Sequence, residues 1–269
     1  MPSQIAKPAS NGPLFPDYLP HYDPLEKIAA HFGPLHVHGW MPHPEKGPAE
    51  FVIVYDSKED LRLRRFWARK NPIQFHPPGI TFFAVIEQPE GVGGDTIFAS
   101  TERAFMKLSP KFRSRVEGLK AVHTTAAQLS REIEDNKEKS TVRRPVTTSI
   151  HPVVTVHPVT GAKNLFVNSS YTKRIEGFDD DESEYLLKLL FNHIASGHDF
   201  SCRVRYQPGT VVLWDQRACQ HSQTLDYAVR ERRHAFRLTC LANVPIPSKI
   251  EEEDDGCALE EGREMLGLC

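Results

Sequence analysis

The sequence has no long apolar run and no excess of charge of either sign. No run approaches the length that crosses a membrane, and the first 20 residues lack the apolar segment of a signal peptide. The formal net charge is only -2, and basic residues form no dominant patch. We therefore expect no nucleic acid and no membrane among the partners of this chain, and a cytoplasmic location.

Cysteine is also scarce. The five cysteines are an odd number, lie far apart and include no Cys-x-x-Cys pair. Such spacing argues against a disulfide scaffold and against a cysteine-based zinc site. A reduced compartment inside the cell fits this usage best.

The remaining composition is typical of one globular domain. Hydrophobic residues make up 39% and charged residues 25% of the 269 positions, and β-rich folds of this size usually do not divide. Residues 1–24 are rich in Pro, Ser and Asn and predict an extended arm, whereas residues 249–269 predict a solvated acidic tail. The domain itself is expected over residues 25–248.

Periodicity predicts many short strands and few helices. Helical spacing occurs at residues 25–32, at 100–119 with a break before Pro110, and at 179–196. Strand-like runs occur at residues 35–38, 51–55, 79–86, 151–168 (two pieces), 210–214 and 234–241. The pattern favours a mostly β fold with flanking helices, a double-stranded β-helix or jelly roll. The polar segment 128–144 predicts a loop, with a lid over a pocket as the alternative.

Seven motifs follow one another in order over roughly residues 31–245. They are His31-Phe32-Gly33-Pro34-Leu35-His36-Val37-His38, Pro77-Pro78-Gly79-Ile80-Thr81-Phe82, Gly93-Gly94-Asp95-Thr96, His151-Pro152-Val153-Val154, His157-Pro158-Val159-Thr160-Gly161, Leu165-Phe166-Val167-Asn168 and Trp214-Asp215-Gln216-Arg217 through His221 to Arg237. In this order they resemble the taurine/sulfonate dioxygenase family, TauD/TfdA-like enzymes that depend on Fe(II) and 2-oxoglutarate, and in particular its fungal branch. The resemblance implies decarboxylation of 2-oxoglutarate coupled to hydroxylation of a small organic substrate, with a sulfonate-like anion as the commonest theme.

The downstream half of the family's site is present. The resemblance implies that His221 is the distal iron ligand and that Arg233 and Thr96 hold the far carboxylate of 2-oxoglutarate, a task that suits the guanidinium fork. It also implies that Arg237 and His38 meet the substrate's anion. Strand alternation puts Arg233 and Arg237 on one face, although such charges are otherwise usually solvated.

The upstream half of the site is not present. A gapless alignment puts Ala68 and Lys70 where the family has its first iron histidine and its aspartate. Alanine has no lone pair to donate, and an ammonium group repels a dication. His76 is a weak substitute ligand, more often a surface or core histidine, and His151 and His157 are expected to be structural.

The front of the chain is short compared with the family, because few residues separate the opening from the HFGPLHVH stretch. The jelly roll is therefore expected to be incomplete, or the sequence to lack an exon and encode a truncated product. Missing core strands would expose apolar faces and sheet edges, which predicts homo-oligomers or pairing with a paralogue. Two functions stay open: an oxygenase with an altered iron site, and an inactive or metal-free relative that binds a small dianion or serves as a partner subunit.

Overall fold

The computed structural model describes residues 23–38, 48–56, 77–88, 93–127, 130, 146–224 and 233–249. The first 22 residues of the expected arm and the tail from residue 250 lie outside this part, so the domain boundaries stay a prediction. Ala68, Lys70 and His76 lie outside it as well, as does the polar segment 128–144 except for residue 130.

The helices confirm the expected positions. They are α1 (Asp23–Ala30), α2 (Thr101–Lys107), α3 (Pro110–Val116), α5 (Asp180–Ala195) and the short 3₁₀ helix η3 (His198–Phe200). Ser100 caps α2 by accepting a hydrogen bond from the Arg103 N–H, and Ser109 caps α3 directly before Pro110, which explains the break between the two. A capping box of Asp179 and Glu182 begins α5.

Antiparallel strands form the rest of the described fold, which is a mostly β jelly roll. The strands are β1 (Val52–Asp56), β2 (Pro78–Glu87), β3 (Thr96–Ser100), β4 (Lys120–Thr124), β5 (Thr148–Pro152), β6 (Val154–Val156), β7 (Lys163–Leu165), β8 (Thr172–Ile175), β9 (Ser201–Val204), β10 (Val211–Asp215), β11 (Cys219–Gln223), β12 (Arg233–Leu241) and β13 (Ile246–Pro247). The large sheet has the order β1-β12-β2-β10, and the β3 sheet has the order β11-β3-β9. Two further sheets have the orders β13-β6-β7 and β5-β4-β8.

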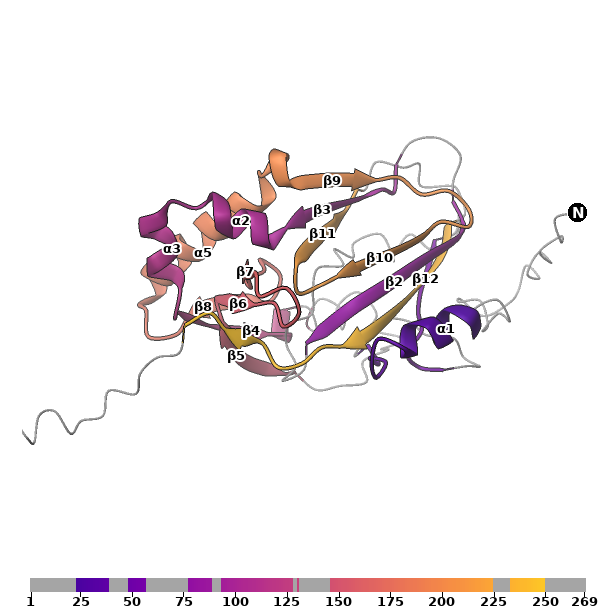
Figure 1. Cartoon of the computed structure of the whole chain (residues 1–269), viewed down its shortest axis with the longest axis horizontal. Coiled ribbons are helices and arrows are strands. Elements are labelled where there is room, and N and C mark those ends of the chain that lie inside the picture. Colours follow the sequence, from indigo (N-terminus) through magenta and orange to yellow (C-terminus); the bar gives the residue numbers. More distant parts are fainter. Residues whose placement is uncertain are drawn as a thin grey trace, which may run out of the picture.

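The large sheet has a buried inner face and an outer face that is buried over β1, β12 and β2 but exposed at Val211 and Leu213 of the edge strand β10. Its outer face packs Phe82, Phe236 and Leu238 against Leu25 and Ala29 of α1, which lies beside β12 in Figure 1. Helices α2, α3 and α5 gather at the other end of the molecule, where they cover a second core. The inner face of the large sheet turns instead toward the β3 sheet.

The inner face is where the two sheets meet. Phe83, Val85 and Ala235 form one apolar cluster with Tyr206 from the segment after β9. Trp214 of β10 also crosses this space, with its ring centroid 5.2 Å from that of Phe98 on β3. Side chains that alternate onto this face of β12 therefore point into the interior of the jelly roll.

The strand predicted at residues 35–38 is wrong, because this segment forms only an isolated bridge from Leu35 to Cys240. Both edges of β12 are already taken along most of its length, by β1 up to Arg237 and by β2. The segment reaches only the end of that strand, where the His36 N–H donates to the Thr239 carbonyl oxygen at 2.7 Å.

Candidate functional site

Two arginines of β12 carry the positive charge of the site. Arg233 and Arg237 alternate with Ala235, which lies in the inner cluster, so both side chains belong to the inner face. Arg233 is 2% exposed, and Arg237 is half-buried with its Nε atom enclosed. The structure thus brings the two predicted cations together in the interior, and the solvated alternative does not describe them.

Arg233 lies beside Thr96, the other residue assigned to 2-oxoglutarate. Its Nη2 donates to the Gly94 carbonyl oxygen at 2.7 Å, and its guanidinium carbon stands 5.8 Å from the centre of the Tyr206 ring. The Tyr206 hydroxyl donates in turn to Thr96 Oγ1 at 2.7 Å. One buried group of side chains therefore holds a guanidinium and a hydroxyl, the donors that bind a carboxylate well.

The Gly93-Gly94 turn makes the contact between Arg233 and β3. Gly93 and Gly94 have φ values of 123° and 67°, a region that favours glycine, and they bring the Gly94 carbonyl oxygen to the guanidinium. Asp95 follows, is 3% exposed, and accepts from Arg203 Nε at 2.6 Å. This ion pair ties the start of β3 to β9 and keeps Thr96 at the inner face.

Tyr171 is an ionisable residue close enough to Arg237 for the two to affect each other's pKa. Burial raises the pKa of the Tyr171 phenol, and the Arg237 cation opposes that rise. Burial likewise lowers the pKa of Arg237 below its ordinary value. Among the described residues nothing accepts a hydrogen bond from Arg237 Nε, so this guanidinium suits an anion that enters from outside the chain.

His221 lies in the middle of β11, opposite Phe98 of β3. Its imidazole is 7% exposed and packs against the Trp214 ring at 5.0 Å between centroids. Trp214 of the large sheet therefore packs against both His221 and Phe98 of the β3 sheet, and the rings of these two residues lie 6.0 Å apart. The predicted iron ligand therefore points into the space between the two sheets that also contains the arginines.

Asp215 holds the turn between β10 and β11, which precedes His221. Arg217 forks onto this carboxylate, with Nη2 2.6 Å from Oδ2, and His157 Nε2 lies 2.9 Å from the same oxygen. The backbone N–H groups of Val159 and Thr160 donate to His157 Nδ1, so its proton sits on Nε2 and is donated to Asp215. Burial alone would raise the pKa of Asp215, but the hydrogen bonds from Arg217 and His157 outweigh it and lower the pKa to about 2.

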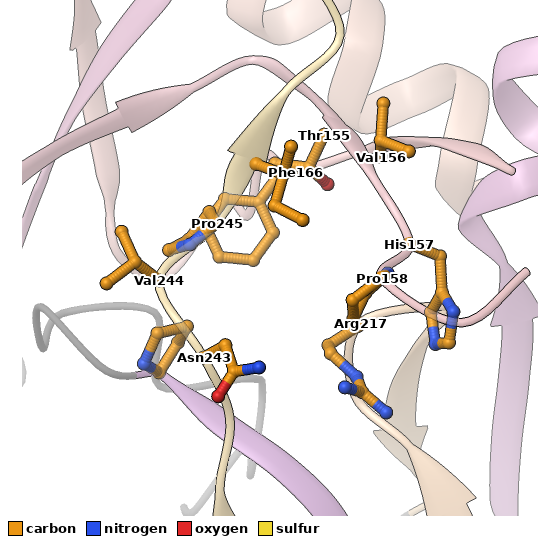
Figure 2. A pocket seen from close by; sticks show the side chains of 11 residues that line it. Thr155, Val156, His157, Pro158, Phe166, Arg217, Asn243, Val244 and Pro245 are labelled. Atoms are coloured by element: carbon orange, nitrogen blue, oxygen red, sulfur yellow. The ribbon is translucent and has the colours of Figure 1, made fainter. Parts of the chain in front are cut away.

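His157 therefore has a structural role, as expected, and joins two turns far apart in the sequence. Figure 2 shows His157 and Arg217 on one side of a small pocket, with Asn243 and Val244 on the other. The pocket holds about 20 Å³, room for a single water molecule. None of the candidate ligand-binding side chains Thr96, His221, Arg233 and Arg237 lines this pocket. We therefore do not regard it as a substrate site.

The described residues do not assemble the iron site of the family. No group of three His, Cys, Asp or Glu side chains that could hold a metal occurs in the described ranges. A facial triad needs two histidines and a carboxylate, and the described residues do not bring such a set together around His221. The positions of Ala68, Lys70 and His76 stay untested, since all three lie outside the described residues.

His38, assigned to the substrate anion, is 7% exposed, and its ring lies 6.0 Å from that of His36. That assignment stays a prediction. Sequence reasoning missed Tyr206 and Tyr171, each buried beside one of the two arginines. Strand alternation past Val204 could have placed Tyr206 on the inner face, but no motif marked it.

The fold and the buried side chains on its inner face agree with what the family resemblance implies. A jelly roll whose interior holds a histidine and two arginines is the arrangement of the 2-oxoglutarate-dependent dioxygenases described above. The chain belongs to the taurine catabolism dioxygenase TauD, TfdA family, whose model matches residues 15–239.

Relatives and solved structures agree with this membership. The chain is 65% identical over 256 residues to the alpha-ketoglutarate-dependent dioxygenase cnsM of Penicillium expansum, a match that covers 92% of this chain and 71% of that protein. It is 36% identical over 242 residues to an alpha-ketoglutarate-dependent sulfonate dioxygenase of Saccharomyces cerevisiae, covering 86% of this chain and 56% of that protein. A taurine dioxygenase structure from Burkholderia xenovorans superposes with a TM-score of 0.67 at 28% identity, over 84% of this chain and 75% of that one.

Proposed function

We propose that this chain binds 2-oxoglutarate through Arg233 and Thr96 and a small organic anion, sulfonate-like in charge and shape, through Arg237. The observation that carries the proposal is the pair of β12 arginines on the inner face, next to a buried Thr96 hydroxyl. The enclosed Nε of Arg237 has no acceptor among the described residues, and a guanidinium is costly to bury in this way without an anion. The sulfonate dioxygenase among its relatives supports this substrate class.

Each side chain has a separate task in this proposal. The guanidinium fork of Arg233 suits the far carboxylate of 2-oxoglutarate, to which the Thr96 hydroxyl adds a third hydrogen bond. Arg237, four residues along the strand, holds the substrate's anion and fixes its distance from the cosubstrate. Trp214 and Phe98 exclude water from the space around His221.

We propose further that the iron site departs from the family pattern. The gapless match puts Ala68 and Lys70 in place of two ligands, and His76 is a weak substitute. Neither alanine nor an ammonium group donates a lone pair to a metal at neutral pH. We therefore assign the oxygen chemistry of the family to no described residue.

A second candidate is a metal-free relative that binds a small dianion or serves as a partner subunit of an active paralogue. The charge of Lys70 favours it, because an ammonium group can pair with a carboxylate where the family has a dication. The described helices include none that is long and apolar enough to cross a membrane.

An anaerobic titration of the purified protein with iron(II) and 2-oxoglutarate tests the first candidate. An oxygenase gives a weak visible charge-transfer band, and on admission of oxygen it forms succinate. Absence of both refutes oxygenase activity. Thermal shift with 2-oxoglutarate, with and without chelator, tests the second candidate, because stabilisation that disappears with chelator contradicts metal-free binding.

A further inference from the structure

Tyr206 contacts both donors of the proposed 2-oxoglutarate clamp. It follows β9, is 6% exposed, and its ring packs edge-on to Phe83 of the large sheet at 5.3 Å. Its hydroxyl donates to Thr96 Oγ1 at 2.7 Å, and its ring lies 5.8 Å from the Arg233 guanidinium carbon. One side chain from a third segment thus links the two residues that the family assigns to the cosubstrate.

The direction of the hydrogen bond fixes what Thr96 can do. A threonine hydroxyl has one proton to donate and two lone pairs to accept with. Because Tyr206 donates to Oγ1, one lone pair is used and the proton of Thr96 must point elsewhere. Among the described residues no acceptor takes that proton, so it is available to a ligand carboxylate.

The buried setting of Tyr206 keeps its hydroxyl a donor. Burial raises the pKa of Tyr206, which the hydrogen bond to Thr96 and the Arg233 cation only partly oppose. The phenol is therefore protonated at neutral pH. The ring faces the guanidinium within the range of a cation–π contact, which holds Arg233 in one orientation while its Nη2 reaches the Gly94 carbonyl oxygen.

We propose that Tyr206 is a positioning residue for the distal carboxylate of the 2-oxo acid: it turns the Thr96 hydroxyl outward as a donor and braces Arg233 against the Gly93-Gly94 turn. Tyr206 does not itself contact the ligand. The inference rests on the proposed function, since it concerns the same carboxylate clamp. It adds that the chain selects 2-oxo acids by their second carboxylate through a relay of two hydroxyls, in which Tyr206 donates to Thr96 and Thr96 donates to that carboxylate.

A double-mutant cycle tests the relay. Tyr206→Phe removes the hydroxyl but keeps the ring over Arg233, and Thr96→Val removes the donor itself. The affinity for 2-oxoglutarate is measured by calorimetry under argon, with and without iron(II), for the wild type, each single variant and the double variant. Tyr206→Phe should weaken binding about 5- to 10-fold, the value of one hydrogen bond. In the Thr96→Val background the same change should cost less than about 2-fold.

A second ligand separates positioning from packing. 2-Oxobutyrate has the 2-oxo acid group but lacks the distal carboxylate, so its affinity should be the same for Tyr206→Phe and the wild type. Thr96→Ser, which keeps a hydroxyl, should retain the sensitivity to Tyr206→Phe. Equal affinities of Tyr206→Phe and wild type for 2-oxoglutarate overturn the inference, as does an equal loss in the Thr96→Val background.

The proposed function can fail separately from the relay. If the wild type binds no 2-oxoglutarate in either condition, the clamp itself is wrong and the inference falls with it. If the wild type binds 2-oxoglutarate and Arg233→Met abolishes binding while Tyr206→Phe changes nothing, the clamp stands and only the role of Tyr206 is refuted.

Discussion

His123 should make the fold sensitive to mild acid. This β4 residue is fully buried, its Nδ1 lies 3.1 Å from Thr172 Oγ1, and Nε2 has no hydrogen-bond partner among the described residues. Burial, and secondarily the neighbouring His151, lowers the pKa of His123 from 6.5 to about 3. The folded protein therefore holds His123 neutral above about pH 3.

The size of the effect follows from the difference between folded and unfolded states. Between about pH 3 and pH 6.5 the unfolded chain binds a proton at His123 that the folded chain does not, so stability falls as the pH decreases through 6.5. For a pKa of 6.5 in the unfolded state, lowering the pH from 7 to 5 removes about 2 kcal/mol of the free energy of unfolding. In a domain of this size that is a decrease of roughly 4 to 8 °C in the melting temperature.

Urea unfolding at pH 7, 6 and 5 measures this slope, provided that unfolding is reversible. His123→Asn, which keeps a polar atom near the position of Nδ1, is less stable at pH 7 but should lose about 2 kcal/mol less than the wild type between pH 7 and 5. Thr172→Val is the control: it removes the hydroxyl contact and keeps the imidazole, so the wild-type slope should remain. Equal slopes of wild type and His123→Asn would refute the reasoning.

Two further substitutions test the site. Asp215→Asn should lower the free energy of unfolding by roughly 2 kcal/mol at pH 7, because the carboxylate with a pKa of about 2 loses its charged hydrogen bonds to Arg217 and His157. Wild type and variant should converge in acid, as the pH falls through about 2; a difference that is constant with pH would contradict this. Arg237→Met should leave the melting temperature unchanged or raise it, since it replaces an enclosed guanidinium whose Nε has no described acceptor with an apolar chain. It should also abolish the thermal shift caused by 1-hexanesulfonate; a lower melting temperature together with intact sulfonate binding would show that Arg237 is structural.

The sequence predicted the elements that depend on local chemistry. The break between α2 and α3 follows from Ser109 and Pro110, and the start of α5 follows from its acidic capping box. Strand alternation correctly placed Arg233 and Arg237 on one face. Alternation alone does not say which face is inside, and here the family motifs supplied that step.

What the sequence could not predict depends on contacts between distant segments. Tyr206 meets Thr96 across 110 positions and His157 meets Asp215 across 58, and neither pair shares a motif. The wrong prediction of a strand at residues 35–38 has the same origin, because the partner edge on β12 was already occupied. The periodicity of one segment predicts that it can form a strand, but it does not tell whether another strand already occupies the edge with which it would pair.

The charge of Arg237 links ligand binding to folding. No described carboxylate pairs with this guanidinium, and its ionisable neighbour Tyr171 is held in the neutral form by a raised pKa. Burial takes away the hydrogen bonds that this guanidinium would make with water, and an anion beside Arg237 would replace them. Such an anion should bind the folded state and not the unfolded chain. A ligand that binds only the folded state raises the free energy of unfolding. At a concentration of 100 times its dissociation constant, a sulfonate should add about 2.7 kcal/mol, whether or not iron is present. The proposed anion site at Arg237 and the iron site of the family use different residues, so sulfonate binding should not depend on iron.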